Sequence, residues 1–181
     1  TFPIVPIAEL HDLFTPLSEL PQSTQDLYKY DVTAAKKLLA DAGQAAGFAV
    51  EMVVSTTSQT NQDLIALIQN MWKDIGVTLT IKSMESAVYV ATGNAKSFSN
   101  MIYWYDGTSS PYKLNNWRPN NPQNAGNVVS PQLVDVVNQV NSVFPFDEAT
   151  AAKLIKAQTP YILDNCWNIT PPQPNLYWFT Q

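Results

Sequence analysis

The sequence has few of the residues that enzymes and metalloproteins most often use in their sites. Its 181 residues include one histidine, His11, one cysteine, Cys166, and six glycines. Ser-His-Asp or Cys-His catalysis would have to recruit His11 from a proline-rich segment, and no Gly-x-Ser-x-Gly elbow is present. His/Cys zinc sites lack ligands, and the glycines form no phosphate-cradling pattern. Because a lone cysteine cannot close an internal disulfide, Cys166 is predicted to be a small buried hydrophobic residue.

Charge and long apolar runs are also scarce. Charged residues make up 14% of the chain, the net charge is −5, and no basic stripe is present, which argues against a nucleic-acid partner. No apolar run approaches the roughly 18 residues that a membrane span needs. The length suits one domain or one large lobe. Because the chain starts at Thr1 and no signal peptide is visible, we expect that an upstream part, with its targeting information, has been removed or left out.

Strand and helix patterns alternate along the first half of the chain. Prolines argue against long helices in residues 1–30, whose apolar residues still predict an arm that packs. Caps and periodicity then predict a helix from the N-cap Asp31 to the stop at Gly43. They also predict a strand, a helix and a second strand at 48–55, 61–75 and 77–82. A strand–helix–strand unit of this length predicts a parallel pair, and the alternation of the second strand predicts one buried face.

The second half of the chain continues this pattern. A short helix over 86–92 ends at Gly93-Asn94, a strand begins at Met101, and residues 115–127 are expected to form a loop. Helices are predicted at 131–143, with Ser130 as cap, and at 148–158, with Asp147 as cap. Strand pieces are predicted at 161–163, 168–170 and 177–179. The alternation indicates one α/β lobe.

Aromatic residues gather where the strand at Met101 breaks into a polar turn. Asp106-Gly107 and Ser109-Ser110-Pro111 are turn signals, and aromatic residues surround them at Tyr103, Trp104, Tyr105, Tyr112 and Trp117. Flat faces with a few hydrogen-bonding groups at a sheet rim are a common small-molecule site. The alternative is that these aromatics fill a core or cover an edge.

Two acids and a sequon allow other interpretations. Asp106 and Glu85, at a predicted strand end, could form a carboxylate pair in a glycoside-active enzyme, although two surface carboxylates explain them as well. Asn168-Ile169-Thr170 matches a glycosylation sequon, which is a frequent chance match.

Residues 28–181 resemble, in order and at matching intervals, the family 5 extracellular solute-binding proteins, which are receptors of ABC importers for oligopeptides, dipeptides and nickel. Tyr30–Gly43 is similar to the family segment YDPEKAKKLLAEAG, and Phe48–Met52 to the strand GFEVTL that follows it. Residues 65–80, 101–104, 130–135 and 159–162 are similar to IQQQLKKIGIKV, DMALSGW, NPEVDALL and APYIPL.

The resemblance implies a two-lobed fold of the periplasmic-binding-protein type (type II, cluster C), about three times this length. This chain would supply one lobe, an α/β unit with a mixed sheet flanked by helices. Residues 1–30 would be an arm from a missing N-terminal lobe, and residues 31–181 the C-terminal lobe. The implied function is capture of a peptide or similar solute outside the cytoplasm, in the periplasm or at the cell surface by a lipid anchor. The partners would be membrane permease subunits, and the receptor would be a monomer, with no catalysis, cofactor or metal.

The predicted ligand-binding residues lie in the aromatic turn: Tyr103, Trp104, Tyr105, Asp106, Gly107 and Tyr112. In peptide-binding members an Asp three residues after the Trp binds the peptide amino terminus. That position is Gly107 here, although Asp106 precedes it and Pro111 matches a later family proline. The ligand therefore stays open between a peptide gripped by Asp106 and a sugar or other neutral solute stacked on the aromatics.

Overall fold

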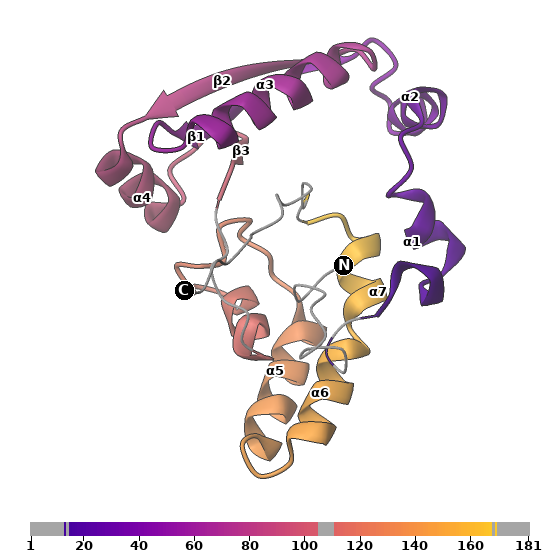
Figure 1. Ribbon diagram of the computed structural model, residues 1–181, viewed down its shortest axis with the longest axis vertical. Helices are drawn as coiled ribbons and strands as arrows, with labels where there is room; N and C mark the ends of the chain where they lie inside the picture. The colour runs from indigo at the N-terminus through magenta and orange to yellow at the C-terminus, as the bar shows by residue number, and fades with distance from the viewer. Residues whose placement is uncertain (1–12, 14, 105–110, 168, 170–181) are drawn as a thin grey trace, which may run out of the picture.

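The computed structural model describes residues 13, 15–104, 111–167 and 169, and a three-stranded parallel sheet lies at one end of the molecule (Figure 1). The strand order is β2-β1-β3, with β1 at Phe48–Ser55, β2 at Val77–Met84 and β3 at Met101–Ile102. Phe48 pairs with Val77, and Met52 with Met101. The α/β class, the limits of β1 and the parallel pairing were all predicted from the sequence and are confirmed.

Helix α3 (Gln59–Lys73) covers one face of the sheet because alternate strand residues point to the same side. Met52, Val54 and Leu79 form a buried cluster with Ile65 of α3. The helix begins where Ser58 accepts a hydrogen bond from the backbone N–H of Asn61 at 3.3 Å, two residues earlier than predicted. On the opposite face of the sheet, β2 contributes the exposed polar residues Thr78, Thr80 and Lys82.

Helix α4 (Ser86–Ala95) connects β2 to β3 and contacts β1. It is longer than predicted, because Gly93 lies inside it and the chain turns out of the helix at Lys96, whose φ is 53°. We call β1, β2, β3, α3 and α4 the sheet unit.

A second group of helices fills the other end of the molecule (Figure 1). It comprises the 3₁₀ helix η3 (Pro111–Trp117), α5 (Pro131–Val143), α6 (Glu148–Lys156) and α7 (Thr159–Asp164), which we call the helical unit. The limits of α5 match the prediction, since Ser130 caps it and Pro131 opens it. The buried core of this unit joins all four helices: Leu13, Leu114, Trp117, Val128, Leu133, Val136, Val137, Val140, Ala151, Ala152, Ile155 and Ile162.

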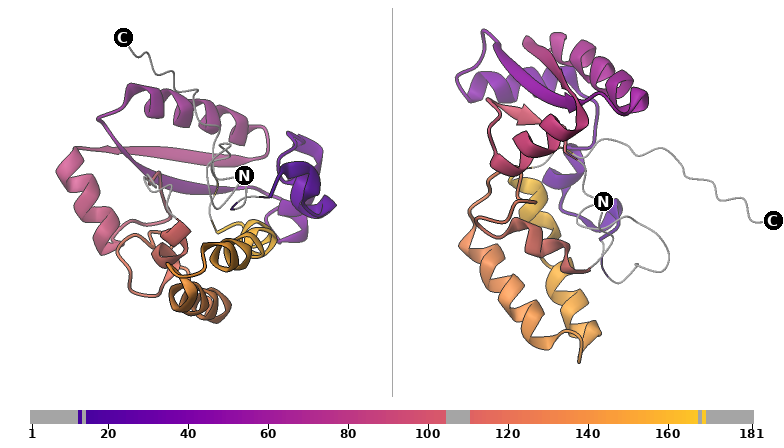
Figure 2. Two further views of the ribbon diagram at one scale, coloured as in Figure 1. Left: turned by 60° about the horizontal axis from the view of Figure 1, so that its bottom comes forward. Right: turned by 90° about the vertical axis from the view of Figure 1, so that its left-hand side faces the viewer.

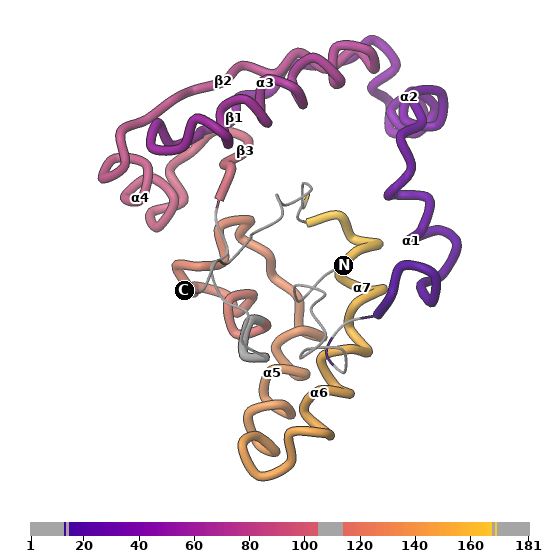
Figure 3. The backbone as a smooth tube through the Cα atoms, viewed as in Figure 1, coloured from indigo at the N-terminus to yellow at the C-terminus, as the bar shows by residue number. Residues whose placement is uncertain are grey.

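Two short helices lie at the start of the described chain, and the second of them packs on the helical unit. They are η2 (Leu17–Glu19) and α1 (Gln22–Asp26), in agreement with the expectation that prolines prevent long helices here. The fully buried Thr24 hydroxyl donates to the Asp164 carboxylate at 2.6 Å and ties α1 to α7. Helix α2 (Val32–Asp41) then leads to the sheet unit. The backbone trace shows the sheet unit and the helical unit at opposite ends of the molecule, with α1 and α2 running along one side between them (Figure 3), and Figure 2 shows the ribbon from two other directions.

Three expectations for the second half of the chain are wrong. Residues 161–163 lie in α7 and not in a strand, because Ile162 turns into the helical core with an exposed fraction of 2%. Residues 115–117, expected in a loop, belong to η3. Cys166 is exposed and not buried, since the chain leaves α7 there with a φ of 50°. The strand pieces expected at 168–170 and 177–179 lie outside the described residues, except for the exposed Ile169.

Candidate functional site

The strand order defines one edge of the sheet as the expected ligand site. The chain leaves β1 through α3 toward β2 on one side, and returns through α4 to β3 on the other side of β1. The topological switch point therefore lies between β1 and β3, and open α/β sheets bind ligands outside the carboxyl ends of such strands. These ends are Ser55 for β1 and the Tyr103-Trp104 pair that follows β3.

Tyr103 and Trp104 continue β3 and have different surroundings. The Tyr103 N–H donates to the Val53 carbonyl at 2.8 Å, which extends the strand pairing by one residue. The Tyr103 side chain packs against the cluster under α3, and burial raises the pKa of its hydroxyl. Tyr103 was predicted to bind ligand, and its partly buried side chain also packs against the core.

Trp104 is half-buried and rests on α4. Its ring lies 5.3 Å from the ring of Tyr89, centroid to centroid, at a tilt of 35°. The hydroxyl of Tyr89 donates to the carbonyl oxygen of Tyr103, and the indole N–H of Trp104 donates to Oε1 of Gln123 at 3.5 Å. Trp104 is thus held between the sheet unit and the segment before α5.

Gly93 lies directly beside the Trp104 ring. A Cβ built on Gly93 would come within 3.0 Å of the ring atoms Cζ3, Cη2 and Cε3. The sequence pattern suggested that Gly93 ends the helix, but its φ is not in the left-handed region, and the helix passes through it. Glycine inside a helix costs about 1 kcal/mol relative to alanine. The contact with Trp104 gives the reason for glycine at this position.

The other predicted ligand-binding residues are placed only in part. Tyr105, Asp106 and Gly107 lie outside the described residues, and Tyr112 lies in η3. Trp117, from the same aromatic stretch, is buried in the helical core, with its ring 5.9 Å from that of Trp167. For Trp117 the alternative of core filling is therefore correct.

Sequence reasoning missed the polar residues at the end of β1. The Ser55 and Thr57 hydroxyls lie 2.9 Å apart, and the Thr57 N–H donates to Ser55 Oγ at 3.3 Å. The N-terminus of α3, with its partial positive charge, begins at the same edge. Only the strand order shows that this Ser/Thr loop lies beside β3. Gln123 was missed because nineteen positions separate it from Trp104.

The structure gives the second acid of the suggested carboxylate pair a structural role. The Glu85 carboxylate accepts a hydrogen bond from the Ala87 N–H at 3.0 Å and caps α4. Among the described residues, no three His, Cys, Asp or Glu side chains cluster as metal ligands would. The same part of the chain contains no helix with the length and apolar character of a membrane span.

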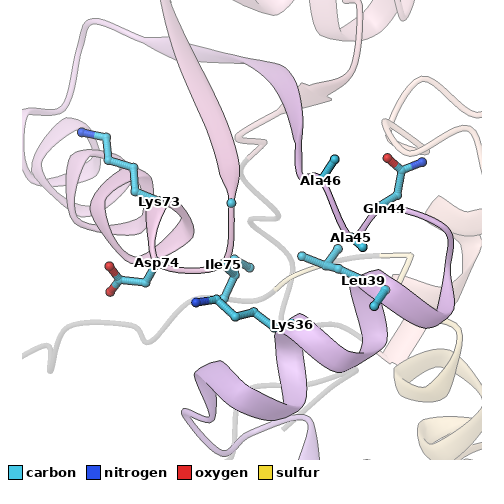
Figure 4. A pocket seen from close by; sticks show the side chains of 10 residues that line it. Lys36, Leu39, Gln44, Ala45, Ala46, Lys73, Asp74 and Ile75 are labelled. Atoms are coloured by element: carbon cyan, nitrogen blue, oxygen red, sulfur yellow. The ribbon is translucent and has the colours of Figure 1, made fainter.

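Two surface pockets of about 340 Å³ each lie at the other edge of the sheet. One is formed between α2 and the end of α3, where Lys36 and Leu39 face Ile75 and Lys73 points away (Figure 4). The other is lined only by apolar residues: Leu39, Phe48, Val50, Trp72, Ile75, Val77, Met101 and Ile169. Because these residues surround the amino ends of the strands, neither pocket belongs to the Trp104 edge.

The chain belongs to the bacterial extracellular solute-binding proteins, family 5, because residues 9–125 match the family description "Bacterial extracellular solute-binding proteins, family 5 Middle". The resemblance stated from the sequence is confirmed. Members of this family are transport receptors and not enzymes. No curated protein sequence matches the chain.

Solved structures with the same fold include peptide-binding receptors. HbpA2 from Haemophilus parasuis superposes with a TM-score of 0.72 at 23% identity, over 86% of this chain and 31% of that one. A dipeptide binding protein from Pseudoalteromonas sp. SM9913 in complex with Met-Leu gives 0.68 at 18% identity, over 86% and 31%. The periplasmic binding protein DppA from Helicobacter pylori in complex with the peptide STSA gives 0.63 at 20% identity, over 77% and 28%. This chain therefore spans about a third of the length of these proteins.

Proposed function

We propose that this chain is one lobe of the substrate-binding component of an ABC importer, which captures an oligopeptide or similar small solute in a cleft between two lobes. The observation that carries the proposal is the position of Trp104. It lies at the switch point of the sheet in a family 5 chain, is half-buried, and contacts the ring of Tyr89 in α4, so that an aromatic side chain stands at the edge where open α/β sheets bind ligands. Closure of a second lobe by hinge motion would desolvate the ligand against this wall.

The share of the neighbours' length that this chain covers is consistent with one lobe of a two-lobed receptor. It covers 28–31% of the length of the three neighbours reported above, two of which were solved with a peptide. In the proposed full-length receptor, residues 31–181 form the C-terminal lobe and residues 1–30 the connection from the other lobe. The receptor works outside the cytoplasm as a monomer and delivers its ligand to permease subunits in the membrane.

Each wall residue has a proposed role. Trp104 stacks on the ligand, Asp106 accepts hydrogen bonds from a cationic group such as a peptide amino terminus, and the Gly107 backbone donates. Tyr105 and Tyr112 complete the aromatic wall, and the exposed part of Tyr103 lies beside Trp104.

A carbohydrate is the second candidate ligand. Tyr89 and Gln123, two side chains that contact Trp104, are uncharged, and hydroxyl groups of Ser55 and Thr57 lie at the neighbouring strand end. An aromatic face surrounded by amide and hydroxyl groups suits a neutral ring as well as a peptide.

The test is calorimetric titration of the full-length protein with the dipeptide Met-Leu, the tetrapeptide STSA, cellobiose, and nickel with L-histidine. If the ligand is a peptide, D106N should weaken binding about tenfold or more, because a charge-assisted hydrogen bond contributes about 1.5–3 kcal/mol. The matched control is D74N, an exposed carboxylate at the opposite sheet edge. Tight cellobiose binding that D106N leaves unchanged would support the carbohydrate receptor, and binding of none of the four would count against both.

A further inference from the structure

Helix α4 meets the back of Trp104 with two residues one turn apart. Tyr89 is 5% exposed and contacts the indole with its ring, while Gly93 provides the space in which the six-membered ring of Trp104 lies. We propose that Tyr89 and Gly93 are positioning residues that fix how deeply the Trp104 indole sits in the wall and thereby set the size of ligand the cleft admits. This inference rests on the proposed function, since Trp104 must face the ligand.

Three residues of the described chain constrain the position of the ring. Gly93 limits its depth, because any side chain there would overlap with three ring atoms. Tyr89 holds the Tyr103 backbone through its hydroxyl and the Trp104 ring through a tilted ring contact. Gln123 Oε1 accepts a long hydrogen bond from the indole N–H at 3.5 Å and so favours one orientation of the ring.

Gly93 differs in this respect from the other glycines of the described chain. Gly43, Gly47 and Gly76 have φ values of 77°, 76° and 84°, so their backbone conformation explains them. Gly126 has no such conformation, and a Cβ there would make ordinary contacts of 3.6 Å. Gly93 is the only one of these five described glycines that a neighbouring side chain, the Trp104 ring, explains.

A larger residue at position 93 should therefore push the indole toward the cleft. A protruding ring narrows the space for a long ligand more than for a short one. We expect G93A to weaken STSA binding about tenfold relative to Met-Leu binding, which is the size of effect that a displaced aromatic contact can produce. Y89F keeps the ring and removes the hydroxyl, so it should loosen the Tyr103 backbone and change both affinities in the same direction.

The ligand-free readout is ¹⁹F NMR of the full-length protein labelled with 5-fluorotryptophan, with the Trp104 resonance assigned through W104F. G93A should move this resonance, and the matched control G126A should leave it in place. This measurement separates the two proposals: if no ligand binds, the receptor function fails, while the resonance still reports on positioning. An unmoved Trp104 resonance in G93A would overturn the inference.

A second pair of variants keeps the test valid if G93A folds poorly. The three atoms nearest to the added Cβ all belong to Trp104. In a W104A background the added methyl group should lose its clash and gain helix propensity, so W104A/G93A should unfold at a higher temperature than W104A. The opposite order, or an equal loss from G93A in both backgrounds, would show that Gly93 acts through something other than the indole.

Discussion

The sheet unit and the helical unit differ in how much core they bury. Of the residues that the structure describes, twelve form one buried cluster centred on the helical unit, whereas the buried cluster between α3 and the sheet has four. The sheet unit nevertheless carries Trp104, so the thinner part of the molecule carries the proposed site. Elements that take part in binding are often drawn from the less stable parts of a structure, and the thicker core would serve as the scaffold.

Few described side-chain contacts join the two units near the site. The Trp104 indole donates to Gln123, and the Lys96 ammonium donates to Asn127 Oδ1 at 3.1 Å. Both acceptors lie in the segment between η3 and α5. The comparison implies that the units can lose structure separately, and the following substitutions test that implication.

The largest effects are expected from one change made in both cores. Ile65 in α3 and Ile155 in α6 are both fully buried, with exposed fractions of 0%. Their replacement by alanine should lower the free energy of unfolding by about 2–5 kcal/mol. I155A should cost more, because neighbours in the larger cluster cannot collapse into the cavity as easily. Denaturant unfolding of both variants gives the two values.

Hydrogen exchange shows where each core substitution acts. I155A should lower amide protection mainly in residues 131–164, and I65A mainly in residues 48–84. If either variant lowered amide protection equally in both units, the chain would unfold as one cooperative body. The two units would then not differ in their free energies of unfolding.

The second prediction concerns the start of the two long strands. Gly47 and Gly76 precede Phe48 and Val77, which pair, and a Cβ on Gly47 would come within 3.0 Å of the Gly76 carbonyl oxygen. G47A combines a left-handed backbone, about 1–2 kcal/mol, with overpacking, about 1–3 kcal/mol. We expect G47A to destabilise the chain by about 2–5 kcal/mol in urea unfolding.

Substitutions of two other glycines separate the backbone cost of G47A from its overpacking cost. G43A meets open space at a φ of 77°, so it should show the backbone cost alone. G126A, in the segment that packs with the helical unit, should be close to neutral. If G47A cost no more than G43A, the close approach of the strand starts would not matter for stability.

Much of the fold could be predicted where local chemistry alone decides. Ser130-Pro131 opens α5 and Asp31 caps α2 without help from distant residues, and both limits were correct. The strand at 48–55 was found because Gly47 and the polar residues after Ser55 bound it. Parallel pairing followed from the length of the connection through α3.

Errors arose where tertiary contacts override the local pattern. Tyr161 and Ile162 favour strands as residues, but burial of Ile162 in the helical core selects a helix. The sequence pattern predicts that Gly93 ends a helix, whereas the structure shows that Gly93 lies inside α4 and makes room for the Trp104 ring. At the site, Trp104 could be predicted from its strand end, whereas Ser55 and Gln123 could not, because strand order and the course of the segment before α5 bring them to that edge.

The smallest expected effect is a difference between the two units in how their helix caps respond to low pH. Helix α6 of the helical unit is capped by Asp147, whose carboxylate accepts bonds from the Thr150 side chain at 2.7 Å and the Thr150 N–H at 3.0 Å. These bonds hold the pKa of Asp147 below its ordinary value. Helix α3 of the sheet unit is capped by Ser58, which has no charge to lose.

A carboxylate whose pKa is lower in the folded state stabilises that state above its unfolded pKa of about 3.9, and the contribution disappears as the pH falls through the folded pKa. When the pH is lowered past about 4, the protection factors of amides at the start of α6 should therefore decrease. Those at the start of α3 should decrease only at a lower pH. D147N keeps a good cap without titrating, so its α6 should follow α3. If α6 of D147N lost protection over the same pH range as the unaltered chain, the acid sensitivity would come from carboxylates elsewhere and the pH difference between the units would not depend on their caps.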